Sequence, residues 1–399
     1  MREWKEVKLG DYIKVKHGFA FKGKNIIAEE TTNILVTPGN FNIGGGFKKS
    51  KLKYYNGEVP QDYILKENAV IVTMTDLSKE SDSLGYSAKV PKSINGEKYL
   101  HNQRIGLVQF KNDSINYDYI YWVMRTREYQ GYIIGSSSGT SIMHTSPSRI
   151  EDYAFSIPSP SEQKAIAEVL SSLDDKIDLL HRQNKTLEQM AETLFRQWFI
   201  EEADEDWEEG KLGDNVDVLL GGTPSTKNDN YWDGNIPWIN SGEINKFRIF
   251  HPSKLITELG MKKSSTKLLP KGTTVLAITG ATLGQVSRLE ISSCANQSVV
   301  GVIGNDIFSN EFIFLWIKYS IKDIIANQTG GAQQHINRDD VKNTIVIIPS
   351  KDVQSHFQIT IEPLFDKITN NVFQIENLEN LRDTLLPKLM SGEVRIRYE

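Results

Sequence analysis

The sequence has little of several features that define common protein classes. It contains one cysteine, Cys294, which excludes an internal disulfide framework and suits a reducing compartment. No apolar run approaches the ~20 residues that span a bilayer, and the opening MREWKEVKLGDYIKVKHG lacks the apolar core of a signal peptide. We therefore expect a soluble, cytoplasmic protein.

Motifs of common nucleotide- and metal-dependent enzymes are also missing from the sequence. There is no G-x-x-x-x-G-K-[ST] phosphate loop, no Asn-Pro-Pro-aromatic motif of amino-methyltransferases, no clear dinucleotide fingerprint and no Cys or His cluster with metal spacing. The seven histidines are scattered. The sequence thus predicts no catalytic site, no metal site and no cofactor of its own.

A strong excess of positive charge is absent too. The 399 residues carry a formal net charge of −5, and the segment EEADEDWEE at 201–209 is acidic. A protein that holds nucleic acid mainly by nonspecific phosphate attraction is usually more basic. If this chain binds nucleic acid, we expect a partner to supply part of the charge.

What the sequence does contain is a long run of apolar residues at seven-residue spacing, from Ser161 to Ile200. A strict heptad repeat keeps one narrow stripe facing a partner, so it predicts a helix that packs against another helix. At 1.5 Å per residue, roughly forty residues make a helix of about 60 Å. The expected seam comprises Ile166, Leu170, Leu173, Ile177, Leu180, Asn184, Leu187 and Leu194.

The partner of this helix lies later in the same chain. LDDKI at 173–177 corresponds to LFDKI at 364–368, and QNKTLEQMAETL corresponds to QIENLENLRDTL. The chain is therefore a tandem duplication with two long antiparallel helices related by a pseudo-twofold axis. The second seam comprises Phe357, Ile361, Leu364, Ile368, Asn371, Ile375, Leu378 and Leu385.

One polar residue interrupts each seam, Asn184 in the first and Asn371 in the second. An antiparallel pairing can place the two amides face to face, where they would fix the register. In the alternative interpretation one or both amides point to solvent. Arg382 would lie opposite Leu173 in the paired register, which argues against it.

The remaining sequence forms two strand-rich segments that share an opening W-x-E-x-K-L-G-D, at Trp4 and at Trp207. A nuclease carboxylate–lysine pair is one interpretation, but no upstream aspartate is suitably placed; an anchored edge segment followed by a turn fits better. Short apolar runs bounded by Gly, Asn and Pro predict strands, and 117–132 predicts a helix. We expect an α+β protein with strand-rich domains at 1–158 and 207–350, helices at 159–201 and 351–392, a linker at 202–206 and a tail at 393–399.

The two copies keep their framework and differ in their loops. Asn296-Gln297 in the second copy matches Asn102-Gln103 in the first. In contrast, the segment GGTPSTKNDNYWDGNIPWINSGEINKF differs from its counterpart GFAFKGKNIIAEETTNILVTPGNFN. This pattern favours two binding domains of one design that read different targets.

Taken together, IPSPSEQKAIAEVLSSLDDKI after the first domain and LENLRDTLLPKLMSGEV after the second resemble the specificity subunit of type I restriction-modification enzymes. GGTPS, IPWINSGEI and TGATLG are looser matches. The resemblance covers essentially the whole chain. It implies a noncatalytic DNA reader in which each target recognition domain reads one half of a split sequence.

The same resemblance implies the partners. The helices would space the two half-sites and dock two methyltransferase subunits, with restriction subunits as further partners. S-adenosylmethionine, ATP and Mg would then belong to those partner chains, and none to this one. Three alternatives remain open: a subunit of a modification-only complex, a protein-binding scaffold, and a chain that is itself a nuclease or modification enzyme.

Candidate DNA contacts follow from repeat position and side-chain chemistry, because Gln suits adenine, Glu suits cytosine and Lys grips phosphate. A solvated hairpin is the alternative for the lysine-rich segment 48–53, an exposed loop residue for His335, and a core residue for Trp238. The candidates are Lys22, Phe41, Lys48, Lys51, Thr73, Thr75, Thr140 and Ser141 in the first domain, and Trp238, Ser241, Glu243, Thr279, Gln297, Gln333, Gln334 and His335 in the second.

Overall fold

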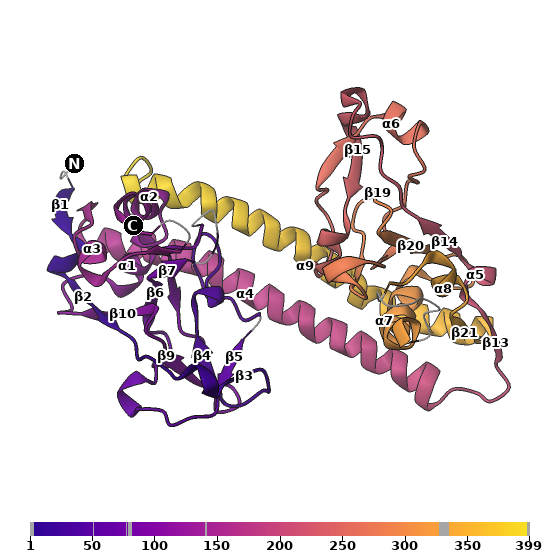
Figure 1. Ribbon diagram of the computed structural model, residues 1–399, viewed down its shortest axis with the longest axis horizontal. Helices are drawn as coiled ribbons and strands as arrows, with labels where there is room; N and C mark the ends of the chain where they lie inside the picture. The colour runs from indigo at the N-terminus through magenta and orange to yellow at the C-terminus, as the bar shows by residue number, and fades with distance from the viewer. Residues whose placement is uncertain are drawn as a thin grey trace. The chain divides into compact units, whose positions relative to one another are not determined.

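The computed structural model describes residues 4–50, 52–76, 78, 82–139, 142–326 and 335–396 (Figure 1). The chain forms two compact units: unit 1 is Met1–Ile177 with Asn377–Glu399, and unit 2 is Asp178–Glu376. The boundary between them falls inside both long helices. Each unit therefore combines one strand-rich domain with a segment of each helix.

The strand-rich part of unit 1 is organised around a four-stranded antiparallel sheet whose two faces are both covered. Val70 and Val72 on one face join the core beneath the helices, and Ile71 on the other joins the core shared with a second sheet. The first sheet has the order β2 (Ile13–His17), β10 (Ile105–Phe110), β6 (Val70–Thr73) and β8 (Ser87–Lys89); the second has β3 (Ile26–Ile27), β5 (Lys53–Tyr55), β4 (Asn33–Val36) and β9 (Lys98–His101).

Further short elements complete unit 1. The terminal strands of the domain pair with each other, so its two ends meet. The expected single helix at 117–132 is two helices, interrupted at 124–126. These elements are β1 (Lys5–Lys8) paired with β12 (Ala154–Ile157), β7 (Thr75–Asp76) paired with β11 (Met143–His144), α1 (Tyr117–Val123), α2 (Arg127–Ser136) and α3 (Pro147–Glu151).

Unit 2 repeats this plan. Its four-stranded sheet β14–β20–β17–β18 has the same connectivity as β2–β10–β6–β8, which confirms the internal duplication. Its strands are β13 (Glu208–Lys211) paired with β21 (Ile345–Ile348), the four-stranded sheet β14 (Asp217–Leu220), β20 (Val299–Ile303), β17 (Thr274–Ala277) and β18 (Val286–Arg288), and the three-stranded sheet β16 (Lys254–Ile256), β15 (Trp232–Ile239) and β19 (Cys294–Ala295); its helices are α5 (Leu212–Asn215), α6 (Glu258–Lys262), α7 (Asn310–Ala326) and α8 (Arg338–Lys342).

The shared W-x-E-x-K-L-G-D segment is an edge strand followed by a single helical turn in both units. Leu9 and Leu212 are fully buried, and Asp11 accepts a hydrogen bond from the Lys8 amide at 3.0 Å. The motif therefore anchors the start of each domain, as the structural interpretation predicted.

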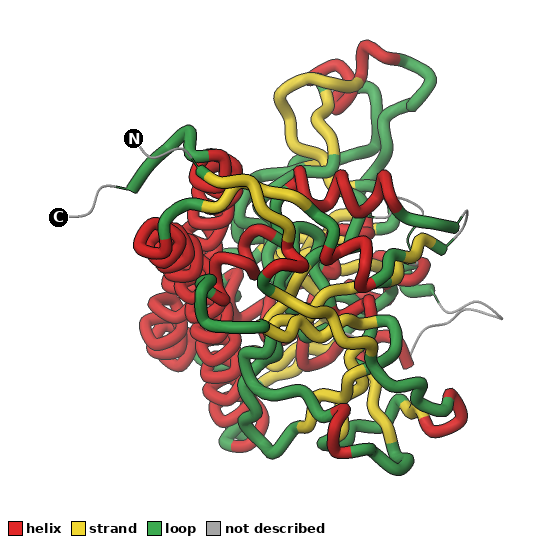
Figure 2. Tube along the Cα trace, turned by 90° about the vertical axis from the view of Figure 1, so that its left-hand side faces the viewer, coloured by secondary structure: helices red, strands yellow, loops and turns green. Residues whose placement is uncertain are grey.

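The two long helices are α4 (Pro160–Arg196), which continues as a π-helical turn at Gln197–Glu201, and α9 (Lys351–Ser391). Figure 2 shows these helical segments in red along the trace. Within each unit α4 and α9 run antiparallel. In unit 1 Glu162 pairs with Arg395, just beyond α9, and Asp174 pairs with Arg382; in unit 2 Asn184 bonds Asn371 and Phe195 contacts Phe357. Every predicted seam residue is buried or half-buried.

The seam amides face each other, as one of the two interpretations predicted. Asn184 and Asn371 are 3% and 1% exposed, so the alternative of solvent-facing amides is wrong. The objection drawn from Arg382 is also wrong. Its guanidinium turns to the Asp174 carboxylate at 2.7 Å and to Asp383 at 2.8 Å, and so does not meet the apolar seam.

Candidate nucleic-acid interface

A cleft of about 510 Å³ opens on unit 1 where the second sheet meets the turns that follow β4 and β9. Three of its lining side chains are cationic, and the described residues that line it include no carboxylate. This combination of amide, cationic and apolar groups suits a polyanion with planar bases. The lining residues are Phe21, Ile26, Leu35, Thr37, Pro38, Gly39, Lys48, Lys53, Asn102, Gln103 and Arg104.

A buried asparagine shapes one wall of this cleft. Asn40 is fully buried, and its side-chain oxygen accepts hydrogen bonds from the Thr37 amide at 2.8 Å and the Thr37 hydroxyl at 3.0 Å. Its amide nitrogen donates to the Lys48 carbonyl at 3.3 Å. Asn40 thus fixes the turn Pro38–Asn40 and holds the backbone of Lys48, which leaves the exposed ammonium group of Lys48 free to approach a phosphate.

The corresponding turn of unit 2, Ser241–Asn245, is fixed by a carboxylate. Glu243 is 8% exposed, and its Oε2 accepts a hydrogen bond from the Asn240 amide at 2.9 Å, while Asn240 Oδ1 accepts one from the Gly242 amide at 2.7 Å. The expectation that Glu243 reads cytosine is therefore not met: its carboxylate caps the turn on which the half-buried Ser241 lies.

Several other expected DNA contacts are core residues. Phe41 is 4% exposed in the core between the two sheets of unit 1, and Thr73 is fully buried with its hydroxyl donating to the Thr75 carbonyl at 2.9 Å. Trp238 is 6% exposed and donates its indole N–H to the Gly222 carbonyl at 3.1 Å. The prediction of base contact is wrong for these three, because their side chains do not reach the surface.

Thr75 is 3% exposed, and its hydroxyl lies 3.1 Å from Nδ1 of His144. This contact joins β7 to β11, so Thr75 has a structural role too. Among the other candidates, Lys22, Lys48, Gln297 and His335 are exposed, and Ser241 and Thr279 are half-buried. Lys51, Thr140, Ser141, Gln333 and Gln334 lie outside the described residues.

Sequence reasoning missed part of the cleft. Lys53 was recognised only as part of a lysine-rich segment, and Asn102, Gln103 and Arg104 were not candidates at all. A signal was present, because Asn-Gln recurs at 102–103 and 296–297, and Gln297 was a candidate in the second copy.

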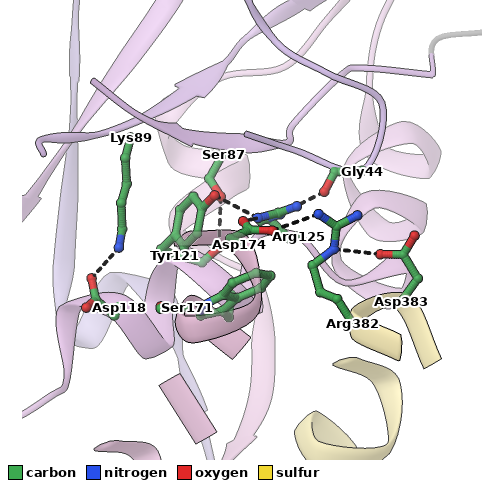
Figure 3. A network of polar contacts seen from close by, with 11 residues as sticks. Gly44, Ser87, Lys89, Asp118, Tyr121, Arg125, Ser171, Asp174, Arg382 and Asp383 are labelled. Carbon is green, nitrogen blue, oxygen red and sulfur yellow. Dashed lines mark hydrogen bonds and ion pairs between the residues drawn. The ribbon is translucent and has the colours of Figure 1, made fainter. Parts of the chain in front are cut away.

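Arg125 connects the loop beside this cleft to the long helices (Figure 3). The loop 42–47 leads directly to Lys48, and Arg125 Nε donates to the Gly44 carbonyl at 2.8 Å. The guanidinium also donates to the Tyr121 hydroxyl at 2.7 Å and forms an ion pair with Asp174 of α4. A Cβ on Gly45 would lie 2.6 Å from the Arg125 side chain, so this loop position requires glycine.

Asp174 lies between two arginines, Arg125 and Arg382. Burial raises the pKa of Asp174, but the two guanidinium groups more than offset this and hold the pKa below its ordinary value. The carboxylate therefore stays charged at neutral pH and joins the domain to both helix segments of unit 1.

Unit 2 makes the same kind of connection with an arginine from the loop itself. Arg248 is 2% exposed, and its Nη1 donates to Glu188 of α4 at 3.2 Å while its Nε lies 3.6 Å from Glu290. Arg288 adds contacts to Glu290 at 3.1 Å and to Glu311 at 2.7 Å. In both units, then, a buried arginine connects the loop that follows the turn (Pro38–Asn40 in unit 1, Ser241–Asn245 in unit 2) to an acidic residue of α4.

No group of three or more His, Cys, Asp or Glu side chains within the described ranges could hold a metal ion. In the same part of the chain, none of the helices combines the length and apolarity needed to cross a membrane.

Comparison with known proteins places these features in a family. The family described as "Type I restriction modification DNA specificity domain" matches residues 1–189 and 204–380. The chain is 28% identical over 305 residues to the type I restriction enzyme MjaIX specificity subunit of Methanocaldococcus jannaschii, covering 71% of this chain and 70% of that one. It is 23% identical over 441 residues to the EcoBI specificity subunit of Escherichia coli, covering 99% and 87%.

A solved structure has the same fold. The crystal structure of the S subunit of a type I restriction-modification system from M. genitalium aligns with a TM-score of 0.60 at 17% sequence identity, over 97% of this chain and 96% of that one. At this level of identity the likeness concerns the fold.

Proposed function

We propose that this chain, which belongs to the type I restriction-modification DNA specificity family, reads a bipartite DNA target, with one half-site bound by the strand-rich domain of each unit. The observation that carries the proposal is one domain frame built twice with different loops. Identical targets would favour identical loops, whereas GGTPSTKNDNYWDGNIPWINSGEINKF and its counterpart share few letters.

The cleft of unit 1 suggests how a half-site is held. Lys48 and Lys53 would bind phosphates and set the position of the duplex, and residues that differ between the two domains, such as Arg104, would face the base edges. The chain is not basic overall, so these contacts supply only part of the affinity. We propose that two methyltransferase subunits, docked on the helices, supply the rest and that restriction subunits can join them.

In this proposal all covalent chemistry belongs to the partner chains, together with S-adenosylmethionine, ATP and Mg, and the complex acts in the cytoplasm. A target adenine must leave the base stack to enter a methyltransferase pocket, so the half-sites must be held while the duplex opens. The role of this chain is to choose the site and to hold it.

We further propose that α4 and α9 set the gap between the half-sites. A duplex turn is roughly 34 Å, so helices of this length suit half-sites about one turn apart on one face of the DNA. An alternative within the same family is a subunit of a modification-only complex, which shares the reading function and lacks the restriction partner.

The decisive experiment is co-expression with the neighbouring methyltransferase chain, followed by mapping of methylated adenines across the genome. A split motif with two short defined halves and a fixed gap is the expected result. If the two chains copurify and methylate adenines without a split motif, bipartite reading is refuted. If they do not copurify and the chain retains no DNA sequence selectively, a protein-binding scaffold replaces the proposal.

A further inference from the structure

The Asn-Gln pair that both copies retain forms the same turn in each unit. In unit 1, Oδ1 of Asn102 accepts a hydrogen bond from the Arg104 amide at 3.1 Å, and the Asn102 carbonyl accepts one from the Ile105 amide at 2.9 Å. The Gln103 amide donates to the Phe19 carbonyl at 2.9 Å. These bonds hold the turn so that Gln103 lies at its exposed tip, on the lining of the cleft.

In unit 2 two of these three bonds recur at the equivalent positions. Oδ1 of Asn296 accepts from the Ser298 amide at 3.1 Å, and the Asn296 carbonyl accepts from the Val299 amide at 3.1 Å. Gln297 is exposed at the tip, as Gln103 is in unit 1.

A glycine packs against each turn at a distance that excludes any side chain. A Cβ on Gly18 would lie 2.0 Å from the Asn102 carbonyl oxygen, and one on Gly221 would lie 2.1 Å from the Asn296 carbonyl oxygen. The two units thus build one rigid turn with one exposed amide side chain at the same place.

The side chain of Gln297 is oriented by a neighbour. The Thr223 hydroxyl donates to Oε1 of Gln297 at 2.5 Å, which occupies one of the two acceptor positions of that oxygen and leaves both Nε2 hydrogens free to donate. Reading an adenine would require the remaining acceptor position of Oε1 together with Nε2, in the geometry that the Thr223 bond imposes. A phosphate oxygen only accepts hydrogen bonds, so it needs only the end that is free.

The internal duplication also favours phosphate as the ligand of these two glutamines. Residues that read bases should differ between two domains with different half-sites, and the flanking residues do differ, with Arg104 in one copy and Ser298 in the other. A contact that both domains keep should fall on what both half-sites share. The sugar-phosphate backbone is the part of DNA that is the same in every sequence.

We propose that Gln103 and Gln297 donate hydrogen bonds to phosphate oxygens at equivalent places in the two half-sites and set the position of the duplex on each domain. This inference rests on the proposed function and replaces the earlier expectation that Gln297 reads adenine. Both residues are then positioning contacts, and base reading is left to the loops that diverge.

The test uses the full chain with its methyltransferase partner and the target found by methylation mapping. Affinity is measured for the intact site and for duplexes with every single substitution in each half-site, using Gln103→Ala, Gln297→Ala and the control Gln109→Ala. Gln109 is an exposed glutamine on β10 of the same domain, distant in the strand from the turn. We expect each turn variant to bind about 3- to 10-fold more weakly, the range of one hydrogen bond, with an unchanged order of preferred bases.

Replacing Gln103 by glutamate distinguishes a phosphate contact from a base contact more clearly than replacing it by alanine. Gln103→Glu sets a carboxylate against a phosphate, so it should lose more affinity than Gln103→Ala and gain no base preference. If Gln103 reads a base, the glutamate variant should shift the preference at one position toward cytosine, and that result would overturn the proposal. In unit 2, Thr223→Val should cause part of the loss of Gln297→Ala.

Unchanged affinity in both alanine variants would also overturn the proposal. If the wild-type complex itself shows no selective binding, the proposed function fails, which is distinct from failure of the variants alone.

Discussion

Asn371 of α9 donates a hydrogen bond from Nδ2 to Oδ1 of Asn184 on α4 at 2.8 Å, inside an otherwise apolar seam. The other side-chain polar atoms, Asn184 Nδ2 and Asn371 Oδ1, have no hydrogen-bond partner among the described residues. A buried amide pair of this kind reduces stability and fixes one register, because any other register would leave an amide opposite an apolar side chain.

This arrangement predicts opposite effects for single and double substitutions. Asn184→Leu should lower the free energy of unfolding by about 1 kcal/mol, since it removes one of the two hydrogen bonds that Asn371 Nδ2 donates, to Asn184 Oδ1 and to Gln183 Oε1. Asn184→Leu combined with Asn371→Leu should restore stability to the wild-type level or above. Denaturant unfolding of the three proteins measures both effects, and a neutral single variant would contradict the paired geometry.

The carboxylate between two arginines predicts a large effect at a single position. Asp174→Asn should lower the free energy of unfolding by about 3 kcal/mol, because it leaves the 4%-exposed Arg125 side chain without its counter-charge. Asp178→Asn is the matched control on the same helix. Its ion pair with Arg182 is exposed and should contribute about 0.5 kcal/mol or less. Equal losses of unfolding free energy in Asp174→Asn and Asp178→Asn, measured by denaturant unfolding, would show that the buried carboxylate contributes no more than the exposed one.

His101, next to the Asn102 turn, predicts a dependence on pH. Burial lowers the pKa of His101 to about 4, although its hydrogen bond to the Ile105 carbonyl raises it slightly. An unfolded histidine has a pKa of about 6.5, so at lower pH the unfolded state binds the extra proton and stability falls. Between pH 7 and pH 5 this residue should cost about 2 kcal/mol.

The comparison of His101→Gln with wild type isolates that contribution. The variant should lose less stability between pH 7 and pH 5 in denaturant unfolding, and the exposed control His181→Gln should behave like wild type. Parallel pH profiles for all three proteins would show that His101 is not the group responsible.

The proposed phosphate contact by Lys48 predicts a change in salt dependence. Lys48→Ala should weaken DNA binding by the complex for all sequences alike, and the slope of log K against log salt should fall by about 0.9. Lys176→Ala, an exposed lysine on α4, is the control. A change of preferred base in Lys48→Ala would instead assign it to base reading.

The spacing role of the helices predicts a change in the recognised gap. Four residues inserted near Asn184, with a matching insertion in α9, lengthen the helices by roughly 6 Å and should lengthen the gap by about two base pairs. The same four residues inserted in the linker 202–206 should leave the gap unchanged. Methylation mapping reads out both, and an unchanged gap after the helix insertion would exclude the spacing role.

The sequence by itself determined the duplication, the two long helices, the α+β class and the family. These follow from periodicity and repeated letters, which are local properties: a heptad stripe such as Leu173, Ile177 and Leu180 predicts a packed helix whatever surrounds it. The seam residues accordingly lie where the pattern placed them.

Only the tertiary structure decided which side chains reach the surface of the domains. All four residues of β6, including Thr73, are buried because helices cover one face of their sheet and a second sheet covers the other, so no alternation of polar and apolar residues marks an exposed face. The cleft brings together Phe21, Lys48 and Gln103, which are distant in sequence. Their proximity depends on the pairing of β4 with β5 and β9, and strand pairing between distant segments leaves no periodic signal in the sequence.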